Sequence, residues 1–136
     1  MIIWINLILS LILTGLIWTI QLVHYPLFNK VDTDAFTNYI KQHQKLMSFL
    51  VIPLMLSELV FAFILMLNAP YGNIGLQIIS FALVIIIWAS TFFLSVPQHQ
   101  KLLQGFNQAA YEKLLQSNWI RTIAWTARSL VLLYLI

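Results

Sequence analysis

Four long apolar segments dominate the chain, at residues 2–25, 46–67, 74–96 and 119–136. A helix needs about 20 predominantly apolar residues to cross the hydrocarbon core of a bilayer, and these segments have about that length. Between Lys45 and Lys101 the sequence carries one charged residue, Glu58, so this interval must hold more than one span. The pattern predicts a single all-α domain over residues 1–136, an antiparallel integral membrane four-helix bundle.

Proline and turn-forming residues predict where the spans end. Because proline disfavours helix at the residue before it, the first span is expected to end at Tyr25-Pro26 and the third at Val96-Pro97. Residues 68–73, Asn-Ala-Pro-Tyr-Gly-Asn, are typical of a short turn. The second and third spans should therefore form a tight antiparallel hairpin.

The first and third connections are predicted to contain short amphipathic helices. Asp32 and Asp34 can cap the first of them, and Asn107 can cap the second. Their apolar positions follow helical spacing, at Phe36, Tyr39 and Ile40 in the first and at Ala110, Tyr111, Leu114 and Leu115 in the second.

The string Gln-His-Gln-Lys-Leu occurs twice, at residues 42–46 and 98–102. One copy enters a predicted span and the other leaves one. The repeat is therefore interpreted as a coincidence, with no shared role predicted for its two copies.

Composition supports a membrane protein and excludes several kinds of chemistry. Hydrophobic residues make up 61% of the chain and charged residues 8%, which is more apolar than soluble domains are. Cysteine is absent, which excludes structural disulfides, thiolate catalysis, iron–sulfur clusters and cysteine-ligated zinc. The apolar N-terminal run lacks the basic region of a signal peptide, so it is expected to stay as the first span.

The net charge of +3 is interpreted as a signal of topology, because the basic residues form no continuous patch that could bind nucleic acid. Six of the seven lie in or beside the two long connections, at Lys30, Lys41, Lys45, Lys101, Lys113 and Arg121. The positive-inside rule then predicts a bacterial-type plasma (inner) membrane protein with both long connections in the cytoplasm and both termini outside.

Each span carries a polar or aromatic stripe at helical spacing, and these stripes are expected to face one another inside the bundle. They run through Asn6, Ser10, Thr14, Trp18 and Gln21 in the first span, His43, Met47, Leu50, Leu54 and Glu58 in the second, Gln77, Ser80, Val84, Trp88, Thr91 and Ser95 in the third, and Asn118, Arg121, Trp125, Arg128 and Leu132 in the fourth. Such stripes form hydrogen bonds between helices or line a ligand site.

Glu58 and Arg128 lie well inside their spans, where a charge costs about 2.5–3.5 kcal/mol on insertion scales. They are expected to pair. The pair would either fix the register of the helices or handle a substrate or proton.

His24, His43 and His99 lie at span ends that the alternating helix direction brings to the cytoplasmic side. Three neutral imidazoles can ligate zinc, copper or iron, and a histidine pair can hold a haem iron. The alternative is that they are ordinary interfacial histidines.

Two cations and an indole share one face of the fourth span, at Arg121, Trp125 and Arg128. This lining suits an anionic or enolate-bearing aromatic molecule, since arginine stabilises an oxyanion and tryptophan offers a flat surface. The alternative is that Arg121 is an interfacial cation and the tryptophans belong to the aromatic belt. Trp18 and Trp88 lie deeper than a belt residue would.

Two stretches carry a resemblance to a known family: Gln21-Leu22-Val23-His24-Tyr25-Pro26-Leu27-Phe28, and Pro97 with His99-Gln100-Lys101-Leu102 followed by Asn118-Trp119-Ile120-Arg121-Thr122. In these the chain resembles the anthrone-oxygenase-like family of small four-helix membrane proteins. The resemblance implies oxidation of anthrone-type polyketides with molecular oxygen and gives His24, His99, Asn118 and Arg121 catalytic roles. A weaker likeness, over residues 15–28, is to the four-helix membrane protoporphyrinogen oxidases that bind haem.

The sequence therefore favours a membrane oxidoreductase or oxygenase with a His/Arg/Trp pocket at the cytoplasmic end of the bundle. Its ligand is expected to be a hydrophobic aromatic or anionic small molecule, and its cofactor a histidine-ligated metal, a haem, or none. The residues expected to bind the ligand are Gln21, Trp18, Trp88, Trp125, Arg128 and Glu58. The alternative is a non-enzymatic binding or accessory protein of the bilayer, and either version could form a homo-oligomer.

Overall fold

The computed structural model describes residues 1–68 and 73–136, and nearly all of them are helical. The elements are α1 (Ile2–Thr19), η1 (Ile20–His24), α2 (Tyr25–Leu27), η2 (Phe28–Lys30), α3 (Thr33–Asn68), α4 (Ile74–Ser90), η3 (Thr91–Ser95), α5 (Val96–Leu102) and α6 (Gln108–Leu135). No strand occurs in the described ranges, and the all-α prediction is confirmed. Most of the predicted turn at residues 68–73 lies outside the described residues.

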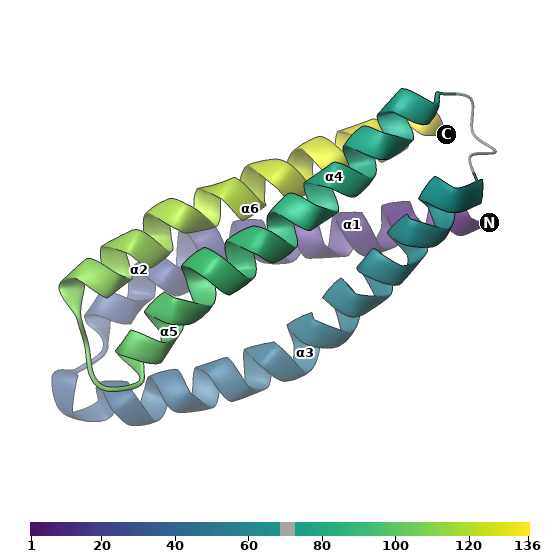
Figure 1. Ribbon diagram of the computed structural model, residues 1–136. Coiled ribbons are helices and arrows are strands. Elements are labelled where there is room, and N and C mark those ends of the chain that lie inside the picture. The colour runs from purple at the N-terminus through teal and green to yellow at the C-terminus, as the bar shows by residue number, and fades with distance from the viewer. Residues whose placement is uncertain (69–72) are drawn as a thin grey trace.

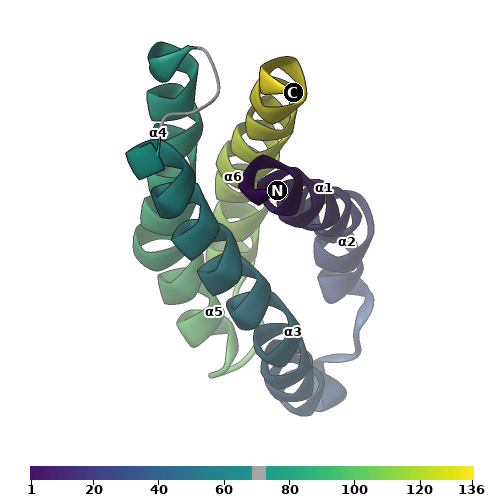
Figure 2. The same cartoon turned by 90° about the vertical axis from the view of Figure 1, so that its right-hand side faces the viewer.

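The helices form four antiparallel rods (Figure 1). Both termini lie at the end where α3 leads to α4, and the two longer connections lie together at the opposite end, as Figures 1 and 2 show. The helix α6 packs against α1 and α4, while α3 packs against the same two helices on their other side. This order brings the ends of the spans that carry the three histidines to one end of the bundle, as the sequence predicts.

The prediction that Pro26 and Pro97 end their helices is wrong, because both rods continue past the proline, to Lys30 and Leu102. In a regular helix the proline ring collides with the carbonyl group four residues earlier. Those carbonyls belong to Leu22 and Phe93, which lie inside the π-helical turns η1 and η3. A wider turn moves the carbonyl away from the ring, so each helix absorbs its proline.

The two amphipathic stretches differ from the prediction in one detail, since each is continuous with the span that follows it. The first turns of α3 bury Phe36 and Ile40, and those of α6 bury Tyr111 and Leu114. The predicted cap of α6 is present, because Oδ1 of Asn107 accepts a hydrogen bond from a backbone amide at 2.8 Å. The predicted short helices are therefore the first turns of α3 and α6, and only short non-helical connections precede them.

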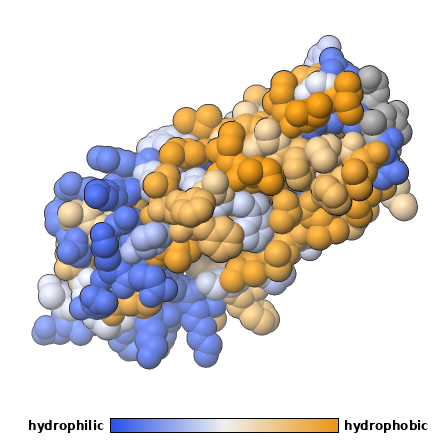
Figure 3. All heavy atoms as spheres, viewed as in Figure 1, coloured by the Kyte–Doolittle hydropathy of each residue, from blue (hydrophilic) through white to orange (hydrophobic). Residues whose placement is uncertain are grey.

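Three helical segments are long and apolar enough to cross a membrane: Ile2–Lys30, Thr33–Asn68 and Ile74–Leu102. The helix α6 is not among them. It carries more polar residues than the others, and those that include Asn118, Thr122, Arg128 and Ser129 are buried. On the face drawn in Figure 3, apolar side chains cover most of the length and hydrophilic side chains gather at the end that carries the long connections. Side chains such as Phe49 and Phe93 are 85% and 78% exposed. An apolar exterior around a polar interior is the arrangement that a bilayer requires.

Candidate functional site

A cleft of about 460 Å³ lies between α3 on one side and α4, η3 and α5 on the other. The wall on α3 consists of His43, Gln44, Met47, Ser48, Val51, Ile52, Met55 and Leu56, and the opposite wall of Trp88, Thr91, Phe92, Ser95, Val96, His99 and Gln100. Ile20, Tyr25 and Arg121 complete it. The volume is within the range of about 300–1,000 Å³ that is usual for small-molecule sites.

Helical periodicity explains both walls. Cleft residues recur about every four positions, from His43 to Leu56 on α3 and from Trp88 to Gln100 opposite, so each set covers one face of its helix. Pro53 lies inside α3 along this wall, and an internal proline removes a backbone hydrogen bond and bends a helix. Figure 1 shows α3 running apart from the rod of α4 and α5 along the middle of the bundle.

The two Gln-His-Gln-Lys-Leu strings lie on opposite walls of this cleft. His43 and Gln44 come from the first copy, and His99 and Gln100 from the second. Gln44 also bridges the walls directly, since its Nε2 lies 3.3 Å from Nδ1 and 3.1 Å from the carbonyl oxygen of His99. Both copies of the string therefore contribute side chains to the same cleft.

These contacts fix the tautomer of His99. Nε2 of Gln44 donates to the His99 carbonyl oxygen, so the amide nitrogen faces the ring, and Nδ1 must accept from it. The proton of the neutral ring is then on Nε2, which donates to the hydroxyl oxygen of Tyr25 at 3.1 Å. Nη2 of Arg121 donates to the same hydroxyl oxygen at 3.2 Å. Two incoming hydrogen bonds leave the hydroxyl hydrogen of Tyr25 for an acceptor in the cleft.

Arg121 is held from behind by a chain of buried amides. Its Nη2 donates a short hydrogen bond to Oδ1 of Asn118, whose Nδ2 donates to Oε1 of Gln21 at 2.7 Å. Nε2 of Gln21 in turn donates to the carbonyl oxygen of Leu115 at 3.3 Å. The predicted residues Gln21 and Asn118 thus orient Arg121, and neither lines the cleft.

Three buried donors around the cleft have no hydrogen-bond partner among the described residues. They are Nε1 of Trp88, Oγ of Ser95 and Nε of Arg121. Ser95 is 1% exposed and Arg121 is 7% exposed, and all three residues line the cleft. An unpaired buried polar group costs about 1–3 kcal/mol, so such a cluster marks a place where a polar group of a ligand fits.

The cleft is also electrostatically unbalanced. None of the described residues that line it is acidic, and Arg121 forms no ion pair within the described ranges. The other buried arginine differs, because Nη1 of Arg128 lies 2.7 Å from Oε1 of Glu58. A buried cation without a counter-charge is costly, and an anionic ligand would supply the missing charge.

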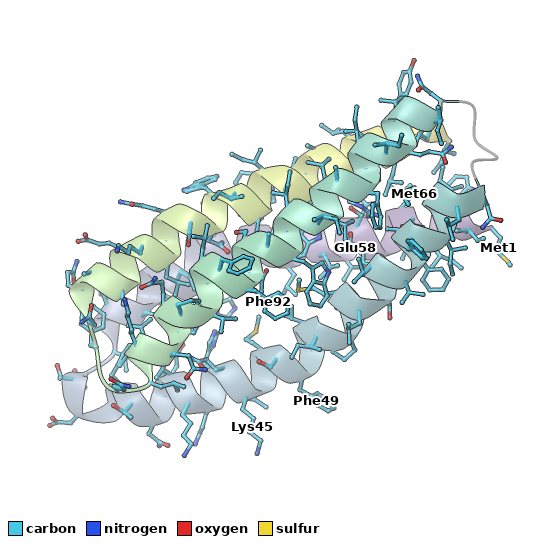
Figure 4. All side chains as sticks on the ribbon, viewed as in Figure 1. Met1, Lys45, Phe49, Glu58, Met66 and Phe92 are labelled. Atoms are coloured by element: carbon cyan, nitrogen blue, oxygen red, sulfur yellow. The ribbon has the colours of Figure 1, made fainter. Side chains whose placement is uncertain are left out.

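The predicted pairing of Glu58 with Arg128 is confirmed, but the pair belongs to a second network outside the cleft lining. Trp125 donates from Nε1 to Oε2 of Glu58 at 2.9 Å, and Nη2 of Arg128 donates to Oδ1 of Asn6 at 2.7 Å. Figure 4 shows Glu58 inside the bundle, whereas Phe49 points away from it. Three residues expected to bind the ligand, Glu58, Trp125 and Arg128, instead join α1, α3 and α6.

Trp18 is likewise occupied by contacts between helices. Its Nε1 donates to Oγ1 of Thr126 at 3.1 Å, and its ring meets the ring of Trp119 edge to face. Four tryptophans and arginines are predicted to bind the ligand, namely Trp18, Trp88, Trp125 and Arg128. Of these, Trp88 lines the cleft, together with Arg121.

The predicted metal site of His24, His43 and His99 is not assembled. Among the residues that the structure describes, no three His, Asp or Glu side chains are grouped as metal ligands would be. The rings of His24 and His43 pack against each other with centroids 5.5 Å apart, and both ring nitrogens of His99 have protein partners. The donor set therefore does not fit a three-histidine metal centre.

Sequence reasoning missed two site residues, Tyr25 and Gln44, and gave Ser95 no function beyond its place in a polar stripe. Gln44 is signalled by the repeated string, and Tyr25 by its place next to Pro26 in the first motif. No family model, curated protein or solved structure matches the chain. The functional argument therefore depends on the geometry of the cleft.

Proposed function

We propose that the protein is an integral membrane protein of four spans that binds a hydrophobic small molecule with an anionic oxygen in the cleft between α3 and α4–α5. The observation that carries this proposal is the group of unpartnered buried donors at Trp88, Ser95 and Arg121. Each can donate a hydrogen bond to a molecule in the cleft, and the Tyr25 hydroxyl adds a fourth donor. Apolar side chains such as Val51 and Met55 would hold the body of the molecule.

Replacing Ser95 with alanine tests the proposal without disturbing a protein contact. The variant should bind 2-naphthoate about tenfold more weakly than the wild type, because a hydrogen bond to a charged acceptor contributes about 1.5–3 kcal/mol. Its thermal unfolding midpoint in detergent should stay unchanged or rise, because the lost hydroxyl has no partner among the described residues. Isothermal titration calorimetry measures the first quantity and circular dichroism the second.

Ser90 provides the matched control. Its Oγ is also buried without a partner in the described part of the chain, on the same rod, but Ser90 does not line the cleft. Ser90→Ala should therefore leave naphthoate binding unchanged. Equal affinities of the wild type and Ser95→Ala, or no binding of 2-naphthoate at all, would contradict the proposed function.

The orientation proposed for the membrane follows the basic residues, with the connection from α5 to α6 in the cytoplasm. The helix α6 has 28 residues, a length of about 42 Å at 1.5 Å per residue, which suffices to cross with the other three. Since the chain contains no cysteine, Gln104→Cys and Ile136→Cys each introduce a unique thiol. In intact cells a membrane-impermeant maleimide should label position 136, and it should label position 104 only after permeabilisation. The reverse labelling pattern would show that the protein has the opposite orientation in the membrane.

A second candidate function is an oxygenase or other oxidoreductase reaction on the bound molecule. Tyr25 favours it, because a hydroxyl backed by Arg121 and His99 can donate to a substrate oxygen on which charge develops. In the reaction that the anthrone-oxygenase resemblance implies, a CH₂ group loses two hydrogens and gains one oxygen atom of O₂, and the other oxygen atom leaves as water. Oxygen uptake by the purified protein supplied with anthrone distinguishes this candidate from a binding protein.

A further inference from the structure

We infer that the ligand is a membrane-dissolved, single-chain carboxylate that enters the cleft sideways, with its head at Arg121 and its tail emerging between α3 and η3. This inference rests on the proposed function, because it assigns the class and the route of the molecule bound at the same site.

The mouth of the cleft is polar toward the hydrophilic end, where Ser48 and Gln100 are exposed, and apolar nearer the middle of the bundle. The apolar part carries the inference. On α3 it is edged by Ile52 and Leu56, which are 50% and 47% exposed, and opposite them by Phe92 and Val96, which are 56% and 39% exposed. Side chains that line a cleft and are also half exposed mark where it opens. All four belong to helices long and apolar enough to cross a membrane, so the opening faces lipid hydrocarbon.

The polarity of the cleft lining changes along its length. Many of its polar groups gather around His99 and Arg121. The exposed cations Lys45 (Figure 4) and Lys101 directly follow the lining residues Gln44 and Gln100 in the sequence. Toward the middle of the bundle the lining becomes apolar at positions such as Met55. An amphiphile in a bilayer has the same gradient, with a charged head near the interface and a chain in the hydrocarbon.

The head is assigned as a carboxylate because Arg121 lacks a counter-charge within the described ranges and the unpartnered groups around it are donors. A carboxylate has two acceptor oxygens and can take several of these hydrogen bonds at once. One chain is assigned because the cleft has a volume of about 460 Å³ and the apolar part of its mouth lies between Ile52 and Phe92.

The experiment uses palmitate with a photoreactive diazirine in the middle of its chain, added to the full-length protein in phosphatidylcholine nanodiscs. Light should attach the probe to peptides that contain residues 51–56 or 92–96. Excess palmitate and excess 2-naphthoate should each suppress this labelling at least about fivefold. The matching diazirine alcohol, which lacks the charge, should label these peptides no more than other lipid-facing segments.

Two tryptophan variants of α3 separate the mouth from the rest of the lipid surface. Ile52→Trp narrows the opening and should reduce palmitate labelling severalfold. Leu50→Trp is the matched control, because Leu50 has nearly the same exposure, 51%, on the same helix but does not line the cleft. Its labelling should equal that of the wild type.

The outcomes separate the two proposals. If 2-naphthoate binds but palmitate labels all lipid-facing helices alike, or if Ile52→Trp and Leu50→Trp behave identically, the lateral entry is wrong and the proposed function stands. Suppression of labelling by phosphatidylglycerol in place of palmitate would also overturn the inference, since the occupant would then be a two-chain lipid. If neither 2-naphthoate nor palmitate binds, both proposals are wrong.

Discussion

Glu58→Gln is expected to lower the free energy of unfolding by about 3–5 kcal/mol, the usual cost of removing one member of a buried ion pair. Arg128 is fully buried and would lose its counter-charge. The amide of the introduced glutamine has one acceptor oxygen in place of two, so it cannot accept from both Arg128 and Trp125 as the carboxylate does. The measurement is reversible unfolding of the purified protein in mixed micelles, followed by circular dichroism.

The double variant Glu58→Gln with Arg128→Met should recover part of this loss, because it leaves no unpaired charge in the bundle. Lys113→Met is the control for removal of a cation, and since Lys113 is exposed on α6 it should change stability by less than about 1 kcal/mol. Additive losses from the two single changes at Glu58 and Arg128 would show that the pair does not stabilise the fold.

The sequence predicts the fold well because a bilayer restricts the choices. Apolar segments of about 20 residues must be helices, and charged residues such as Glu58 and Arg128 must then find each other inside the bundle. The rule used for Pro26 and Pro97 fails for a physical reason. It assumes regular α-helical geometry, whereas the π turns η1 and η3 move the colliding carbonyl and let each helix continue.

The site is less predictable, because it depends on which helix faces part from each other. Periodicity places Trp88, Ser95 and Arg121 inside the bundle but equally places Trp18 and Trp125 there, and the latter two are satisfied by neighbouring helices. What separates these groups is the cleft between α3 and the rod of α4 and α5. Pro53 lies inside α3 along this cleft, and its effect on packing could not be inferred from its position in an apolar segment.

The contacts of the three histidines could not be predicted from the sequence either. Helix direction correctly brings His24, His43 and His99 to one end of the bundle. The rotation of each helix then decides that His99 meets Tyr25 and Gln44 while His24 meets His43. Topology therefore predicts the end of the bundle at which these residues lie, and the separate contacts of the rings do not fit a shared metal.

Arg121→Ala should have the largest effect on ligand binding, weakening 2-naphthoate by at least about 30-fold, since truncation of one partner of a buried charge pair costs about 2–5 kcal/mol or more. The uncharged analogue 2-naphthalenemethanol should lose far less, because it offers no anion. Titration calorimetry in detergent micelles measures both. Lys113→Ala removes an exposed cation from the same helix and should change neither affinity.

Because Arg121 also supports Tyr25 and Asn118, its loss could disturb the site as well as remove a charge. Arg121→Lys separates the two effects. It keeps the cation but has no planar fork to hold both neighbours and a carboxylate, so its affinity for 2-naphthoate should fall between those of the wild type and Arg121→Ala. If Arg121→Lys and Arg121→Ala lose equal affinity for the acid and the alcohol alike, Arg121 supports the shape of the cleft and does not bind an anion.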